Sequence, residues 1–335
     1  MSDTTIGGDR SAIDEADALG QPGKSWNFAD RQWLAVLVLL VALVVLFSAT
    51  QDNFASTANW RTLMSSSAIL WVASIGLTFA FIVGGFDLSI GANLALSGFV
   101  LAWLYTDIGF PIGLAIVATV LFGFSIGALA NGVLIGRYQV SFFIVTLGTL
   151  SLFRGIVNQV SDTKSKPVAN VWTDHLAFSD VVGIPVPVIV SVVITAVAFY
   201  VLRYTYLGRD IYASGGNPAA AALAGIRVQR TTIIVFGIVG ACAAIAGVMQ
   251  AARIGAASPQ VGNTTIFDAA AAVLLGGTSF RGGSGGVIGT ALGVLLLSVV
   301  ANGLAISGLA SAWQQMITGA IVIGAAVIDR IQPRS

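Results

Sequence analysis

The chain has 335 residues, of which 56% are hydrophobic and 9% are charged, and its formal net charge is +1. Soluble domains carry about 25% charged residues, so this composition excludes an ordinary soluble protein and indicates a polytopic protein of the lipid bilayer. Its basic residues are few and dispersed, which excludes a nucleic-acid-binding protein.

Residues 1–29 form a polar tail of mixed charge without a signal-peptide pattern. We expect this tail to be a disordered cytoplasmic extension. Its Gly20–Ser25 stretch is similar to the end of a phosphate-binding loop, but Ala18 stands where that motif needs its first glycine, and no strand precedes it. The chain is therefore expected to bind no nucleotide and no other cofactor of its own.

Residues 30–335 are expected to form a single transmembrane domain, because a helix needs roughly 20 apolar residues to cross a bilayer and such segments recur to the end of the chain. The fold class is an all-α polytopic membrane protein with about ten transmembrane helices. The third and eighth segments are short, so they are expected to be partial or tilted spans. The hydrophobic segments lie near residues 33–50, 63–83, 92–106, 110–135, 140–157, 186–202, 231–252, 265–277, 287–306 and 311–328.

A glycine-rich break, Gly84–Gly91, separates the second segment from the third and contains Asp87 and Ser89. A charged carboxylate facing lipid at the bilayer centre costs ~3 kcal/mol or more, so Asp87 is expected to face the protein interior or an interface. Two interpretations stay open. Asp87 and Ser89 either shape the break and cap the segment beginning near Ile90, or contact the transported solute.

A second break, Gly276–Gly283, adjoins the eighth segment. Two interrupted hydrophobic segments, one in each half of the chain, are typical of a transport pathway. Asn131 and Asn302 lie inside apolar runs, where a buried amide must be hydrogen-bonded, so they either join helices or line a polar path. The candidate pathway residues are Asp87, Ser89, Asn93, Asn131, Thr278, Ser279 and Asn302.

Two patterns indicate how the segments are arranged. Ala130–Val133 recurs 171 positions later as Ala301–Leu304, whereas the two breaks are 192 positions apart, and the difference is about one membrane span. We therefore expect two homologous halves, with an extra helix in the first. Glycines spaced four apart mark faces where helices can approach closely, namely Gly123 and Gly127, Gly132 and Gly136, and Gly285, Gly289 and Gly293.

The distribution of basic residues predicts the orientation. With the N-terminus in the cytoplasm, eleven of the 16 Lys and Arg residues fall on the inner side, so both termini are expected to be cytoplasmic. Residues 158–185 then form an outer loop. Residues 203–230, which hold four arginines, form an inner loop.

The inner loop carries the signature of a short capped helix over residues 217–225. Asn217 is a suitable N-cap and Pro218 a suitable first helical residue. Alanines favour the helix, and Gly225 can end it ahead of Arg227. A short helix that projects from a membrane domain can fit a groove on a partner.

In these stretches the chain resembles the permease subunits of ATP-binding-cassette importers for monosaccharides, the ribose, xylose and arabinose branch. The resemblance rests on GGFDLSIGANLALSG at 84–98, SFFIVTLGTLSLFRG at 141–155, GRDIYASGGNPAAAALAGI at 208–226, DAAAAVLLGGTSFRGGSGGVIGTALG at 268–293 and ANGL at 301–304. Phe86 and Phe280 stand where this family often has isoleucine and leucine.

The resemblance implies a subunit of the bacterial inner membrane that imports a monosaccharide or similar polyhydroxylated solute. A second permease copy, identical or related, would accompany it. A separate cytoplasmic ATPase would hydrolyse the ATP, and an extracytoplasmic binding protein would deliver and select the sugar. The capped helix would couple to the ATPase through Gly215, Gly216, Asn217, Pro218, Ala219, Ala222, Gly225 and Arg227.

One alternative from another class is an ion- or proton-coupled secondary transporter. That class uses interacting intramembrane carboxylates, for which the sequence offers Asp87 and Asp268. Asp268 also begins a segment, where an acidic residue favours a helix N-terminus. We expect no enzyme, no catalytic residue and no metal site, because the sequence holds no nucleophile–base arrangement and a single cysteine, Cys242.

Overall fold

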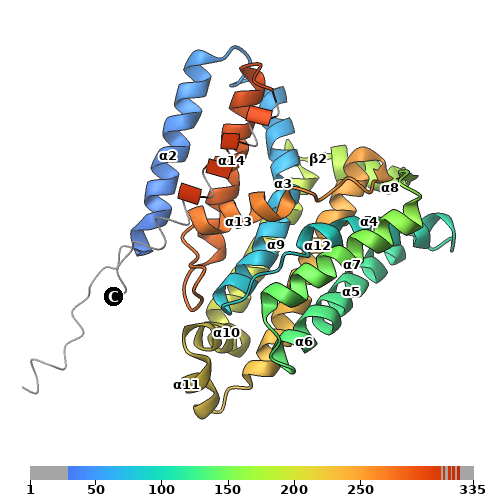
Figure 1. Cartoon of the computed structure of the whole chain (residues 1–335). Helices are drawn as coiled ribbons and strands as arrows, with labels where there is room; N and C mark the ends of the chain where they lie inside the picture. The colour runs from blue at the N-terminus through green and yellow to red at the C-terminus, as the bar shows by residue number, and fades with distance from the viewer. Residues whose placement is uncertain (1–28, 311, 314–315, 318, 321–322, 325–335) are drawn as a thin grey trace, which may run out of the picture.

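The computed structural model describes residues 29–310, 312–313, 316–317, 319–320 and 323–324. Within these residues the protein is a bundle of helices with two small two-stranded sheets (Figure 1). Helices α10 and α11 lie at one end of the bundle and α8 at the other. The predicted disordered tail covers residues 1–29, of which 1–28 lie outside the described residues and Ala29 begins helix α2.

Apolar helices form most of the bundle. These are α2 (Ala29–Thr50), α3 (Thr57–Ile82), α4 (Ile90–Thr106), α5 (Ile112–Ile126), the π-helix η1 (Gly127–Gly132), α6 (Val133–Gly136), α7 (Phe142–Ser161), α9 (Val186–Tyr204), α12 (Val228–Ile254), α13 (Thr265–Leu275) and α14 (Val287–Ile306). The short elements between them are β1 (Lys166–Pro167), α8 (Val171–Phe178), β2 (Asp180–Val181), β3 (Ile184–Pro185), α10 (Tyr206–Gly216), α11 (Pro218–Leu223) and β4 (Ala256–Ala257).

The structure confirms the all-α polytopic class. Among the described residues, seven helices are long and apolar enough to cross a membrane. The third and eighth predicted segments coincide with α4 and α13, which have 17 and 11 residues and are shorter than the roughly 20 that a span needs. The tenth segment, 311–328, includes residues that are not described, so the count of ten stays a prediction.

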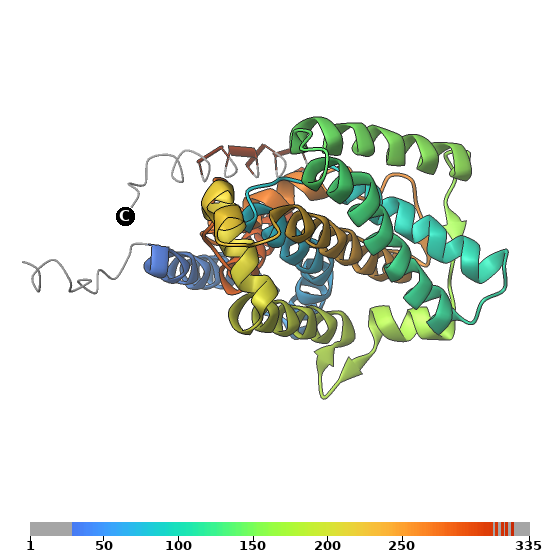
Figure 2. The same ribbon diagram turned by 90° about the horizontal axis from the view of Figure 1, so that it is seen from below.

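Helix α12 forms the centre of the bundle and contacts α3, α4, α5 and η1 (Figures 1 and 2). Its side chains Val239 and Ala243 join Leu77 of α3 and Val273 of α13 in one buried cluster. Cys242 belongs to the same cluster and packs against Gly76, which agrees with an interpretation of this cysteine as a small packing residue. Burying these apolar side chains away from water stabilises the arrangement.

The glycine faces predicted from the sequence lie where helices touch through their backbones. A Cβ atom built on Gly127 would lie 2.3 Å from the carbonyl oxygen of Phe236 on α12. A Cβ on Gly123 would lie 2.6 Å from the oxygen of Gly240, and one on Gly289 of α14 would lie 1.9 Å from that of Gly276. Such approaches leave no room for a side chain, so these positions select glycine by size.

Replacing Gly127 by valine is expected to destabilise the bundle, because the added carbons must push η1 away from α12. Overpacking of this kind costs ~1–3 kcal/mol or more. The melting temperature of the detergent-solubilised protein, followed by gel filtration after heating, measures the effect. Gly148→Val on α7 is the control, because a Cβ there meets nothing within 4 Å. Equal melting temperatures for the two variants would contradict the prediction.

Charged side chains of the connections lie at both ends of the bundle. At the end that carries α8, Arg61 pairs with Asp180 and Lys166 with Asp107. The same hydrogen bond from Lys166 lowers the pKa of Asp107. The arginines of the inner loop lie at the opposite end, on α9–α12.

Both long connections contain secondary structure. In the first, β1 pairs antiparallel with β4, β2 pairs with β3, and α8 begins with a capping box formed by Asn170 and Thr173. In the second, α10 directly precedes α11, so the inner loop has two helices where the sequence predicted one.

Candidate functional site

The carboxylate of Asp87, within the first break, lies at the centre of a buried polar cluster, with 1% of the residue exposed. Its Oδ1 accepts hydrogen bonds from the Ser89 backbone N–H at 2.8 Å and from the Ser89 hydroxyl at 2.6 Å. Its Oδ2 accepts from Nδ2 of Asn131 at 3.2 Å. The protein therefore satisfies this carboxylate internally, as a buried charged or polar group requires.

Asn131 connects the first break to two other elements. It lies on the π-helix η1, a rare form that occurs frequently at functional sites. Its Nδ2 also donates to the Ser89 hydroxyl at 2.9 Å, and its Oδ1 accepts from the Thr149 hydroxyl of α7 at 2.8 Å. One continuous network thus joins the break, η1 and α7, and we call Asp87, Ser89, Asn131 and Thr149 the break network.

The predicted helix cap at this position is only partly correct. Helix α4 does begin at Ile90, with Ser89 at the N-cap position, but the Ser89 side chain makes no capping hydrogen bond. Its hydroxyl instead donates to Asp87, and the carboxylate binds a backbone N–H two residues on, within the break. This geometry agrees with the interpretation of Asp87 as a residue that shapes the break.

The second break is shaped by its own hydroxyls. The Thr278 hydroxyl accepts from the backbone N–H of Gly286 at 3.2 Å, and the Ser279 hydroxyl accepts from the N–H of Arg281 at 3.2 Å. Thr278 is 1% exposed. On α4, the Asn93 amide oxygen accepts from the Ser97 hydroxyl at 3.1 Å, one turn beyond the break network.

Asn302 does not join the other candidate pathway residues. It exchanges two hydrogen bonds of 2.9 Å with Asn59, near the start of α3. The break network lies beyond the other end of α3, a helix of 26 residues and so about 39 Å long. Asn131 and Asn302 therefore have different partners at opposite ends of α3, and the structure does not confirm the predicted repeat.

Helix α11 has the capped form that the sequence predicted. Oδ1 of Asn217 accepts from the N–H of Ala220 at 3.0 Å, and Pro218 is the first helical residue. The helix ends at Leu223, two residues before Gly225, which has a φ of +85°. Of the other candidate coupling residues, Ala219 and Ala222 lie on α11, whereas Gly215 and Gly216 end α10.

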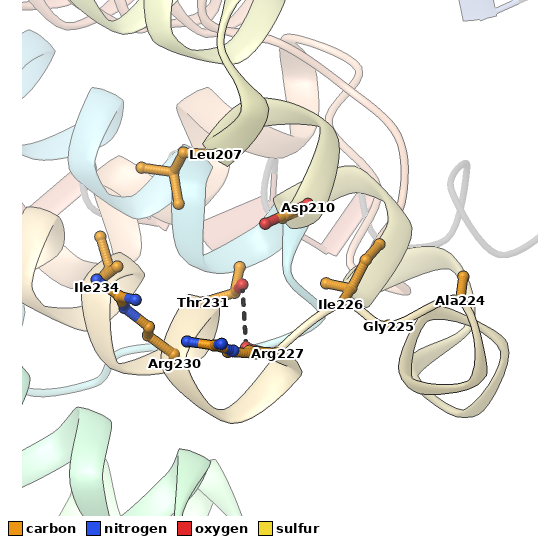
Figure 3. Close-up of a pocket in the computed structure, with 9 residues that line it drawn as sticks. All are labelled: Leu207, Asp210, Ala224, Gly225, Ile226, Arg227, Arg230, Thr231 and Ile234. Atoms are coloured by element: carbon orange, nitrogen blue, oxygen red, sulfur yellow. Dashed lines mark hydrogen bonds between the residues drawn. The ribbon is translucent and has the colours of Figure 1, made fainter.

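A cavity of about 390 Å³ opens between the inner-loop helices and the start of α12 (Figure 3). Arg227 and Arg230 are exposed on its α12 side, and Asp210 of α10 faces them across the space. The positive charges of Arg227 and Arg230 suit a partner surface with acidic groups. The cavity is lined by Leu207, Asp210, Ala224, Gly225, Ile226, Arg227, Arg230, Thr231 and Ile234.

The structure also adds residues that sequence reasoning did not select. Thr149 completes the break network, and Tyr212 of α10 hydrogen-bonds to Gly285, two residues after the second break. A sequence signal for Thr149 was available, because Thr146 and Thr149 are three positions apart and so share one face of a predicted span. No local signal marked Tyr212, because its partner, Gly285, lies 73 positions later in the chain.

Comparisons with known proteins give consistent results. The sequence pattern of one family, described as branched-chain amino acid transport system / permease component, matches residues 59–326. The D-allose transport system permease protein AlsC of Escherichia coli K12 is 37% identical over 313 residues, which is 92% of this chain and 95% of that protein.

Two further relatives extend the similarity. The ribose import permease protein RbsC of Escherichia coli K12 is 33% identical over 314 residues, covering 91% of this chain and 95% of that protein. The xylose transport system permease protein XylH of Haemophilus influenzae is 30% identical over 361 aligned positions, covering 88% and 96%. No solved structure gives a significant match.

Proposed function

The chain belongs to the family of branched-chain amino acid transport system / permease components, and from this premise we propose that it is the permease subunit of an ATP-binding-cassette importer for a monosaccharide. The observation that carries the proposal is the full-length similarity to permeases for ribose, allose and xylose. The family description mentions branched-chain amino acids, but these relatives, aligned nearly end to end, favour a sugar.

The importer needs partners that supply energy and substrate. We propose that two permease copies, identical or related, enclose the pathway, with a separate ATPase on the inner side and a sugar-binding protein on the outer side. The clustering of inner-loop arginines supports an inner-membrane orientation with α10 and α11 in the cytoplasm. Both termini are then cytoplasmic.

Helix α11 is the proposed contact with the ATPase. It projects from the end of the bundle, and Leu223 is 91% exposed at its last turn. An exposed leucine near the exposed Arg227 and Arg230 would fit a groove that is apolar at its floor and acidic at its rim. The cavity beside Arg227 and Arg230 would receive the acidic side chains of that rim.

The pathway is proposed to pass the two breaks, where irregular backbone and polar groups interrupt the apolar helices. Asp87 and Ser89 would set the shape of this region, and Asn93, Thr278 and Ser279 would lie near the passing hydroxyl groups. Irregular backbone at membrane depth is stable only when it is buried in protein or lines a cavity. Asn302 of α14 would instead join that helix to the start of α3 through its hydrogen bonds with Asn59.

Uptake into reconstituted vesicles tests the proposed function. The permease, its ATPase and its binding protein are reconstituted together, and radiolabelled ribose, allose, xylose and leucine are offered with ATP inside or outside the vesicles. We expect one sugar to accumulate only when ATP is on the ATPase side. Accumulation driven by an imposed proton or sodium gradient without ATP would favour the secondary transporter, and accumulation of leucine alone would contradict a sugar substrate.

The geometry around Asp87 argues against ion coupling. Its hydrogen-bond partners are Ser89 and Asn131, neither of which titrates. Carriers of protons through a membrane use chains of titrating groups. We therefore expect uptake to be independent of a proton gradient.

A further inference from the structure

Three segments that are far apart in the sequence meet through their backbones at the inner-loop end of the bundle. The N–H of Gly283, in the second break, donates to the carbonyl oxygen of Ile82 at the end of α3, at 2.8 Å. This hydrogen bond ties the second break to the point where the first break begins. The two breaks therefore form one connected backbone unit.

The end of α10 lies directly against this hydrogen bond. A Cβ atom built on Gly215 would lie 1.8 Å from the oxygen of Ile82 and 2.7 Å from the nitrogen of Gly283. On the other side, a Cβ on Gly282 would lie 2.8 Å from the Gly215 oxygen and 2.9 Å from Cα of Gly84. We call Ile82, Gly84, Gly215, Gly282 and Gly283 the glycine junction.

A side-chain hydrogen bond fixes α10 to the segment that joins the second break to α14. The hydroxyl of Tyr212 donates to the carbonyl oxygen of Gly285 at 2.8 Å, two residues before α14 begins. Burial raises the pKa of this hydroxyl, and nearby Arg203 lowers it by less, so the group stays protonated and able to donate. Helix α10 thus contacts the second break at its last residue, Gly283, and the chain two residues beyond it, at Gly285.

Aromatic side chains join the two breaks a second time. The ring of Phe81, at the end of α3, packs edge-on against Phe86 of the first break and Phe280 of the second, with centroid distances of 5.4 Å in both cases. Phe86 and Phe280 are 5.8 Å apart. Such contacts contribute about 0.5–1.5 kcal/mol each beyond their buried area. The two breaks are therefore expected to move together.

We infer that the glycine junction and Tyr212 transmit the motion of the inner loop directly to both breaks. The inference rests on the proposed function, in which α11 takes up the motion of an ATPase. Pro218, where α11 starts, follows Gly215 by three residues, so a displacement of α11 reaches the junction through a single turn of chain. Backbone-to-backbone contact without intervening side chains makes this connection stiff, because no rotamer can absorb the displacement.

The test measures sugar molecules imported per ATP hydrolysed, in vesicles that contain the complete importer. The probe is radiolabelled ribose, or whichever of ribose, allose and xylose the unaltered protein imports. We expect Tyr212→Phe to lower this ratio about fivefold, the factor that a hydrogen bond of ~1 kcal/mol is worth, while ATP hydrolysis continues. Tyr138→Phe is the matched control, because Tyr138 is exposed near the same end of the bundle.

A second variant tests the backbone contact itself. Gly215→Ala is expected to lower the ratio further than Tyr212→Phe, because the methyl group must separate α10 from Ile82 and Gly283. Gly113→Ala on α5 is its control, since a Cβ there meets nothing within 4 Å. If Gly215→Ala does not fold, Tyr212→Phe decides alone.

Two outcomes would overturn the inference. The first is a Tyr212→Phe protein with an unchanged transport ratio. The second is a parallel fall of uptake and ATP hydrolysis, which would show that the contact only holds the complex together. Loss of coupling on disrupting α11, with normal coupling in Tyr212→Phe, would leave the proposed function intact and refute the junction alone.

Discussion

Replacing Asn217 by alanine and Pro218 by glycine together is expected to abolish ATP-driven uptake while the protein still inserts in the membrane. Helix α11 has six residues, far fewer than a helix needs to be stable by itself in water. Loss of the N-cap alone costs ~0.5–2 kcal/mol, and glycine adds conformational freedom at the first helical position. The helix should therefore unfold, and with it the proposed contact with the ATPase.

The measurement is ATP-driven uptake in vesicles, alongside the amount of permease extracted from the membrane and its melting temperature. Asn217→Ser is the conservative variant, because serine caps a helix about as well as asparagine, and it should restore most of the uptake. Unchanged uptake in the double variant would refute the coupling role of α11. A loss of inserted protein would instead show that α11 is needed for folding.

Replacing Asp87 by alanine is expected to have the other large effect, a near-complete loss of transport with a lower melting temperature. The change leaves two donors of Ser89 and one of Asn131 without their acceptor in a buried site. Each unsatisfied buried group costs ~1–3 kcal/mol, so the break network should rearrange. Asp87→Asn keeps one oxygen acceptor, so its transport rate and melting temperature are expected to lie between those of the unaltered protein and those of Asp87→Ala.

Asp52→Ala is the control for Asp87→Ala, because Asp52 is exposed in the turn between α2 and α3. The two readouts separate shaping from solute contact. If Asp87 shapes the break, transport and melting temperature fall together. If transport falls while the melting temperature is unchanged, the carboxylate contacts the solute. Normal transport in Asp87→Ala would refute both interpretations.

The sequence was sufficient to place the helices of the membrane domain. Nine predicted segments coincide with helices, from 33–50 within α2 to 287–306 at α14, because long apolar runs are a strong and local signal. Both breaks were also predictable, since glycine and a buried carboxylate are out of place inside an apolar helix. The caps of α11 followed from Asn217 and Pro218 by chemistry that acts over a single turn.

What the sequence could not supply were the partners of residues far apart in the chain. Asn131 and Asn302 occur in nearly identical local sequences, yet one bonds to the first break and the other to Asn59. Their surroundings depend on which helices pack together, and no local pattern reports that. Helix α10 was missed for a similar reason, since its glycines argue against a helix, and the need for Gly208 and Gly215 follows only from their close approach to α9 and to Ile82 and Gly283.

The glycine faces of α5, η1 and α12 have a consequence for how this protein can change over generations. In a soluble core, a substitution is judged first by whether it is apolar, and exchanges among valine, leucine and isoleucine are often accepted. At Gly123, Gly127 and Gly240 the first criterion is instead volume, because the neighbouring backbone occupies the space of even one methyl group. These positions can drift only among the smallest residues, so the exchanges that an apolar core accepts are excluded where α5 and η1 meet α12.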